Sequence, residues 1–174
     1  MSSDTIPAFG PTGGLATGTW NLDPERSSVE FCARTLYGLI RVKGGFGRYR
    51  GRFDLATRPA IELTIEADSI DTGNERRDEH LRAADFFDAA DHPRVSFEAG
   101  GATLDGETLH APGILRAAGG QAPLDVTAAI TPAGDEFEIE ASARIDQREL
   151  GMTWSPLGMM RPTDLLVRGR LVRG

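Results

Sequence analysis

DEFEIEASARID, residues 135–146, alternates apolar and polar side chains along its whole length. The apolar set is Phe137, Ile139, Ala141, Ala143 and Ile145, and the polar set is Glu136, Glu138, Glu140, Ser142 and Arg144. Successive side chains of a β-strand point to opposite faces, so the segment predicts a strand with one buried face and one wet face. Strands of this kind are typical of antiparallel sheets.

The same alternation recurs along the chain, bounded each time by Gly, Pro, Asp or Asn. It is clear in residues 27–35, 60–70 and 123–132 and weaker in 39–46, 48–55, 94–99, 102–109 and 164–173. In the three clear segments the inward set is Val29, Phe31, Ala33, Ile61, Leu63, Ile65, Ala67, Leu124, Val126, Ala128 and Ile130. We therefore predict an all-β protein with about eight or nine strands.

A meander of this many strands avoids exposed edges most completely by closing into a barrel. An eight-stranded barrel has room inside for its own side chains or for one small ligand. The predicted inward set includes alanines at positions 33, 67, 128, 141 and 143. They leave a cavity if small residues face one another, or a filled core if large residues face them. The pattern allows both.

One segment, TGNERRDEHLRAADFFDAADHP at 72–93, interrupts the strand pattern. Thr72 and Glu75 have the spacing of a capping box, and Pro93 prevents a helix from continuing past it. We predict a helix over residues 75–88 that covers an end or a side of the barrel. Its apolar residues Leu81, Phe86 and Phe87 are expected to lie on the barrel interior.

The composition is that of one water-soluble domain. The 174 residues carry a formal net charge of −7, which argues against general nucleic-acid binding, and they include one cysteine. No apolar run is long enough to span a membrane. Residues 1–18 have the composition of a flexible tail, which leaves 19–174 as the barrel domain. The start lacks the pattern of a secretory signal, so we expect a cytoplasmic location.

Four stretches resemble the YceI-like family in order and spacing. They are WNLDPERSSVEF at 20–31, VKGGFGRYRGRF at 42–53, SIDTGNERRDEHLRAADFFDAADHPRVSF at 69–97 and IDQRELGM at 145–152. The resemblance implies an eight-stranded, lipocalin-like antiparallel barrel with one helical insertion. It also implies an apolar tunnel that holds a polyisoprenoid or a similar lipid, such as a quinone or a prenyl pyrophosphate, and often a homodimer. The segment at 115–126, LRAAGGQAPLDV, departs from the family pattern.

With this resemblance, the large inward residues become candidates for the wall of a ligand tunnel. They are Val29, Phe31, Phe46, Phe53, Leu63, Ile65, Phe97, Phe137, Ile139 and Trp154, joined by Phe86 and Phe87 from the insertion. Burial alone can hold such a ligand, because a chain of about 40 carbons at about 0.3 kcal/mol per atom reaches roughly 12 kcal/mol. The alternative is that the same residues form an ordinary core.

The charged part of the insertion has two readings. In the first interpretation, the insertion provides a polar mouth that binds an anionic head group, since arginine matches phosphate geometry. The residues of this mouth are Asn74, Arg76, Arg77, Asp78 and His80. In the second, which we favour for Arg77 and Asp78, an Asp78–arginine network with Asp85 as a further partner anchors the insertion to the barrel.

Catalytic signals are weak. His80, His92 and His110 lack metal-ligand spacing, and no nucleophile elbow or phosphate-binding loop is present. We predict a non-enzymatic protein without a cofactor. The alternatives are an enzyme acting on a lipid at the barrel mouth, with Arg77, Asp78 and His80, or a filled barrel that contacts proteins.

Three further groups have ordinary explanations. The basic residues of 41–52 allow transient contact with an anionic membrane but are better explained as the wet face of a strand. Asp88, Asp91 and His92 suit a helix end better than a metal site. Cys32, on an outward strand face, is expected to be inert.

Overall fold

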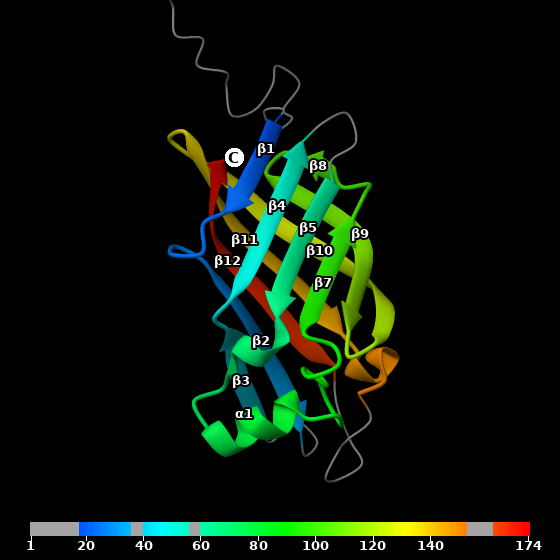
Figure 1. Cartoon of the computed structure of the whole chain (residues 1–174). Coiled ribbons are helices and arrows are strands. Elements are labelled where there is room, and N and C mark those ends of the chain that lie inside the picture. Colours follow the sequence, from blue (N-terminus) through cyan, green and yellow to red (C-terminus); the bar gives the residue numbers. More distant parts are fainter. Residues whose placement is uncertain (1–17, 36–39, 56–59, 153–161) are drawn as a thin grey trace, which may run out of the picture.

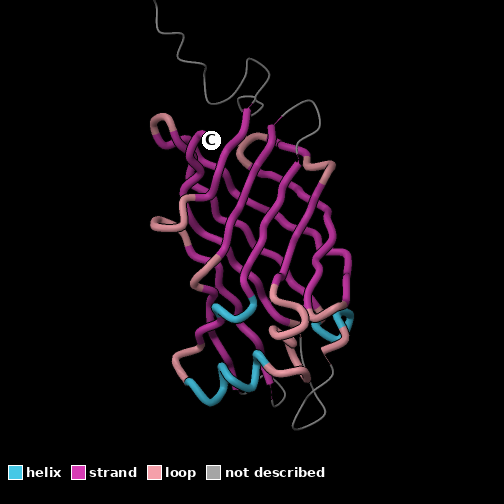
Figure 2. Tube along the Cα trace, in the orientation of Figure 1, coloured by secondary structure: helices cyan, strands magenta, loops and turns pink. Residues whose placement is uncertain are grey.

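The computed structural model describes residues 18–35, 40–55, 60–152 and 162–174, which form an antiparallel sheet closed into a barrel (Figure 1). The strands are β1 (Gly18–Leu22), β2 (Ser28–Thr35), β3 (Ile40–Phe46), β4 (Tyr49–Leu55), β5 (Ala60–Glu66), β6 (Ile70–Asp71), β7 (Arg94–Ala99), β8 (Thr103–Asp105), β9 (Thr108–Ala117), β10 (Gly120–Ala133), β11 (Glu136–Ile145) and β12 (Thr163–Arg173). The helical elements of the described residues are α1 (Glu75–Arg82), η2 (Ala67–Ser69) and η3 (Gln147–Leu150). Figure 2 shows that they gather at one end of the barrel.

Several short strands act together as one interrupted strand of the barrel. β1 and β2 both pair with β12, through Leu22 opposite Leu171 and Val29 opposite Val167. β7 and β8 likewise both pair with β9. β3 pairs with β2 and β6, and β4 pairs with β1 and β5, so β3–β4 and β5–β6 each follow the course of one strand as well. The result is a closed eight-stranded antiparallel barrel, and the pairing of β1 with β12 closes it. This confirms the predicted fold class.

The alternation read from the sequence separates the inside of the barrel from the outside. In β11 the inward residues Phe137 and Ile139 are buried, whereas Glu138 and Glu140 between them are exposed. The exposed carboxylates face arginines of the neighbouring strand, and Arg170 Nη2 lies 3.1 Å from Glu138 Oε1. Charges therefore stay on the outer face while the interior is apolar.

Two predicted strands have different bounds in the structure. The segment 102–109 is a hairpin rather than one strand, because Gly106 turns the chain with a φ of 61° between β8 and β9. The segment 60–70 is interrupted by η2, so Ala67 belongs to a helical turn and not to a strand.

Aromatic packing fills the end of the barrel where β1 and the C-terminus lie (Figure 1). The rings of Trp20 and Phe137 meet edge to face with centroids 4.8 Å apart, and both side chains are buried. The guanidinium of Arg173 lies 4.9 Å from the centre of the Trp20 ring. This end of the interior is therefore occupied by the protein's own side chains.

The helix differs from its prediction at both ends. Its N-cap is Asn74, whose side chain accepts a hydrogen bond from the Arg77 backbone N–H at 3.0 Å, so the predicted capping box with Thr72 is wrong. The helix ends at Arg82 and not at residue 88. Phe86 and Phe87 lie in the turn that follows. Neighbouring helical residues point about 100° apart, so a turn is what allows both rings to face the barrel.

Candidate ligand-binding cavity

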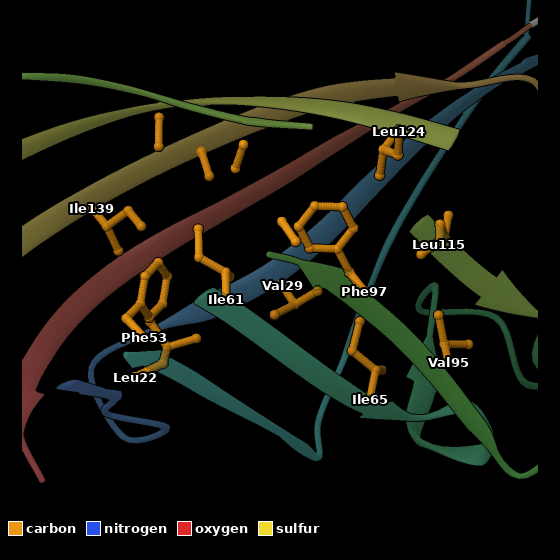
Figure 3. Packing of buried hydrophobic residues seen from close by; sticks show 14 of the residues in the cluster. Leu22, Val29, Phe53, Ile61, Ile65, Val95, Phe97, Leu115, Leu124 and Ile139 are labelled. Atoms are coloured by element: carbon orange, nitrogen blue, oxygen red, sulfur yellow. The ribbon is translucent and has the colours of Figure 1, made fainter. Parts of the chain in front are cut away.

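We call the end of the barrel that is filled by Trp20 and Phe137 the sealed end. A cavity of about 200 Å³ occupies the barrel interior between the sealed end and α1. Figure 3 shows side chains of β4, β5, β7, β10 and β11 that point toward one another around this space. Its inward-facing wall is formed by Leu22, Val29, Phe31, Ala33, Phe46, Gly51, Phe53, Ile61, Leu63, Ile65, Leu81, Phe86, Phe87, Val95, Phe97, Leu109, Leu115, Ala117, Leu124, Val126, Ala128, Ile139, Ala141, Ala143, Ile145, Gln147, Leu150, Met152, Thr163, Leu165 and Val167. The wall is almost wholly apolar.

Small residues make the space. Ala128 of β10 and Ala141 of β11 stand opposite each other in register, and both line the cavity. Ala33, Ala117 and Ala143 line it as well. In a filled core, large residues would occupy the volume beside these alanines. The structure leaves that volume open. Of the predicted inward alanines, Ala67 is buried in η2 and lies outside the wall.

Aromatic rings from three elements cover the cavity at the α1 end. Phe31 and Phe46 have ring centroids 5.8 Å apart, and Phe46 meets Phe87 edge to face at 5.7 Å. All three rings are half-buried, unlike the buried wall residues deeper in the barrel. The insertion thus lays Phe87, together with Leu81 and Phe86, on the interior, as the sequence predicted. These rings form a partly exposed cover over this end of the cavity.

Most of the predicted wall residues line the cavity. They are Val29, Phe31, Phe46, Phe53, Leu63, Ile65, Phe86, Phe87, Phe97 and Ile139. Phe137 faces inward but packs against Trp20 at the sealed end, outside the cavity wall. Trp154 lies outside the described residues. Contact of any of these side chains with a ligand stays a prediction.

Arg77 and Asp78 hold the insertion to the strand before it, through Thr72. The buried Asp78 carboxylate accepts hydrogen bonds from the Thr72 N–H at 2.9 Å and from the Thr72 hydroxyl at 2.5 Å. Arg77 donates to the Thr72 hydroxyl at 2.8 Å and to the Thr72 carbonyl at 2.9 Å. The anchoring role that we favoured for both residues therefore has a geometric basis, and Thr72 is the residue that joins them in the network.

The remaining polar residues of the insertion lie outside the cavity wall. His80 is exposed on α1, and its ring meets Phe86 edge to face with centroids 5.6 Å apart. Asn74 caps the helix, and Arg76 is exposed. Asn74 and Asp78 line a separate, polar surface depression with Arg48 and Arg82. None of these positions is among the residues that line the cavity, and contact of Arg77 or His80 with a ligand stays a prediction.

The basic strand segment behaves as an outer face. Arg48 forms ion pairs with Glu66 and Asp68, the latter at 2.8 Å, whereas Tyr49 and Phe53 turn toward the core. No cluster of three or more His, Cys, Asp or Glu among the described residues is arranged to hold a metal ion, and this includes the trio ending at His92. No helix within the described ranges is long and apolar enough to cross a bilayer.

Sequence reasoning missed several wall residues, and one group of them follows β11 and begins β12. Gln147, Leu150 and Met152 line the cavity beyond the end of β11, and Thr163 joins them from the start of β12. The alternation that places Ile145 inward continues one step to Gln147, and this was the available signal. This signal is easily missed, because a polar residue at an inward position usually indicates that the strand has ended.

Fold and cavity together define a closed eight-stranded barrel with an apolar interior large enough for a small ligand. The chain belongs to the YceI-like domain family, whose pattern matches residues 20–168. It is 33% identical to Protein YceI of Escherichia coli O17:K52:H18 over 169 residues, which cover 89% of this chain and 87% of that protein.

Several solved structures share the fold. BcnA of Burkholderia cenocepacia superimposes with a TM-score of 0.78 at 14% identity, over 87% of this chain and 99% of that one. A domain from Saccharophagus degradans described as polyisoprenoid binding, and implicated in plant cell wall breakdown, superimposes with a TM-score of 0.68 at 12% identity. That match covers 91% of this chain and 100% of the domain. At these identities the likeness concerns the fold alone.

Proposed function

We propose that the protein binds an apolar, isoprenoid-type lipid in the barrel cavity and holds it without changing it covalently. The observation that carries the proposal is the continuous apolar wall around an open volume of about 200 Å³. For comparison, an engineered apolar cavity of about 150 Å³ takes up benzene. The name of the Saccharophagus degradans domain and the family membership support the same class of ligand.

The cavity accepts part of a long chain as it stands. An elongated ligand extends past the half-buried rings of Phe46 and Phe87, which lie at the α1 end. Opening there requires the insertion to move, whereas the opposite end is sealed by Trp20 and Phe137. We therefore propose that the lipid enters at the α1 end. A methyl-branched chain suits a wall in which alanines alternate with larger aliphatic and aromatic side chains.

Holding the ligand requires no catalytic group. His80, the only histidine in the predicted polar mouth, is exposed outside the cavity wall, and Arg77 is engaged with Thr72. Carriage, storage and sequestration all use the same burial. We also propose that the protein is a homodimer with a cytoplasmic location and that it contacts membranes transiently.

Native mass spectrometry of the purified protein tests the proposal. We expect an additional mass of an apolar lipid, or uptake of added farnesol or geranylgeraniol by protein from which lipid has been extracted. A protein that carries no lipid after purification and takes up neither alcohol has no binding function of this kind.

A further inference from the structure

Among the described residues that line the cavity, four are polar, namely Glu30, Ser142, Gln147 and Thr163. Glu30 and Ser142 are exposed on outward strand positions, so Gln147 and Thr163 are the two buried polar side chains of the wall. Thr163 stands opposite Ile145 in register, and Gln147 follows Ile145 by one alternation step. Both side chains are buried, Gln147 with 7% and Thr163 with 9% of its surface exposed. Both line the cavity. The end of β11 and the start of β12 thus present hydrogen-bonding groups to an otherwise oily space.

The backbone of Gln147 is held in place by the short helix η3. Its carbonyl accepts hydrogen bonds from the backbone N–H groups of Gly151 and Met152, the latter at 3.3 Å. Asp146 caps the turn, since its side chain accepts from the Arg148 N–H at 3.1 Å. The position from which the Gln147 side chain projects is therefore determined by local structure and not by a mobile loop.

The side-chain carbonyl of Gln147 has no hydrogen-bond partner among the described residues. Its Oε1 is inaccessible to solvent and accepts no hydrogen bond from the described residues. Buried acceptors without a partner are rare in folded proteins because each one loses its hydration. An ordered water needs two to four polar partners, which the apolar wall around Gln147 supplies poorly. A polar atom of a bound ligand can supply the missing hydrogen bond.

The charge of the wall limits what that polar atom can be. No lysine or arginine of the described residues lines the cavity, and Gln147 and Thr163 are neutral. A phosphate placed among these groups loses its hydration without gaining a counter-charge. A hydroxyl is neutral, and it can both donate and accept, so it fits the Gln147 amide in either orientation of its nitrogen and oxygen.

We infer that Gln147 binds the polar end of the ligand, and that this end is an uncharged hydroxyl, as in an isoprenoid alcohol. The inference rests on the proposed lipid-binding function and names the head group which that function leaves open. Thr163 lies near enough in the strand register to serve as a second polar contact. Gln147 is thus a specificity-determining residue, whereas the rest of the wall binds the chain.

The test compares three ligands with the same carbon skeleton on the full-length protein. Displacement of the neutral dye N-phenyl-1-naphthylamine measures the affinity of farnesol, of farnesyl pyrophosphate and of the saturated hydrocarbon farnesane. We expect farnesol to bind at least about tenfold more tightly than the other two, which corresponds to about 1.4 kcal/mol. Gln147→Met keeps the length of the side chain but removes its hydrogen-bonding atoms, and should weaken farnesol binding about tenfold while leaving farnesane unchanged.

Folding of the variant is controlled separately. Removing an unpartnered buried acceptor should leave the Tm of the lipid-free protein unchanged or raise it. Gln147→Leu serves as a second apolar variant. Gln121→Met, on an exposed position of β10, is the matched control and should bind all three ligands as the wild type does.

The outcomes distinguish the head-group assignment from the proposed function. Equal farnesol affinity in the wild type and in Gln147→Met, or tightest binding of the pyrophosphate, overturns the assignment but leaves lipid binding intact. Failure of all three ligands to displace the dye from the wild type removes the lipid-binding function itself, and the assignment with it.

Discussion

Filling the cavity from one wall should block lipid binding without unfolding the barrel. Ala128 is 2% exposed and lines the cavity opposite Ala141, whereas its neighbour Ala129 is exposed on the outer face of the same strand. We predict that Ala128→Phe abolishes most of the binding and that Ala129→Phe does not. The two variants carry the same change on adjacent residues, so their comparison isolates the effect of occupying the interior.

The size of the effect follows from the cavity volume. An apolar cavity of about 150 Å³ admits benzene, so a phenyl group takes up a large part of the 200 Å³ present here. It excludes about six or seven ligand carbons, which at about 0.3 kcal/mol each amount to about 2 kcal/mol. The expected loss of affinity for farnesol is therefore roughly 30-fold. Because the ring fills open space, Tm should stay unchanged or rise.

Dye displacement measures the affinity, and thermal unfolding followed by circular dichroism measures Tm. If Ala128→Phe unfolds cooperatively at the wild-type temperature and still binds farnesol with wild-type affinity, the lipid does not occupy the cavity. Ala141→Phe, which approaches the same space from β11, provides an independent second variant. Agreement of the two variants excludes a local distortion of β10 as the cause.

Three further predictions concern stability. Asp78→Ala removes two hydrogen bonds to a buried carboxylate and should destabilise the protein by about 1.5–3 kcal/mol, which lowers Tm by several degrees. Gly113→Ala places a Cβ within 2.6 Å of an aromatic ring atom, so it should cost about 1–3 kcal/mol, whereas Gly100→Ala meets no atom within 4 Å and should cost much less. The Arg26 guanidinium, bonded to Glu136, holds the pKa of that carboxyl below its ordinary value of 4.5. A lowered folded-state pKa stabilises above the ordinary value, so the stability advantage of the wild type over Arg26→Gln should be present at about pH 7 and disappear as the pH falls through the folded-state pKa.

Each of these has a matched control or a contradicting result. Glu79→Ala changes an exposed carboxylate next to Asp78, and it should leave Tm nearly unchanged. An equal loss of Tm in both variants would show that the burial of Asp78 is irrelevant. Equal Tm values for the two glycine variants would contradict the steric argument. A difference between the wild type and Arg26→Gln that persists at about pH 2 has another cause than the ionised Glu136.

The depth of a residue in the barrel could not be predicted from its own strand. Phe137 and Ile139 occupy equivalent inward positions on β11, yet Phe137 packs against Trp20 at the sealed end while Ile139 lines the cavity. The difference arises because β1 brings Trp20 to this end when it pairs with β4 and β12. This pairing joins distant segments, so no local pattern reveals it.

The alternation of side chains by itself determined which face of most strands is buried, and hence an antiparallel all-β fold and many of the residues that face the interior. It does so because the period of two is a property of the single strand. Only the tertiary structure decided where the insertion stops being helical, which end is sealed, and that the acceptor of Gln147 is left without a partner. These features depend on contacts between segments far apart in the chain, where the packing of one element sets the surroundings of another.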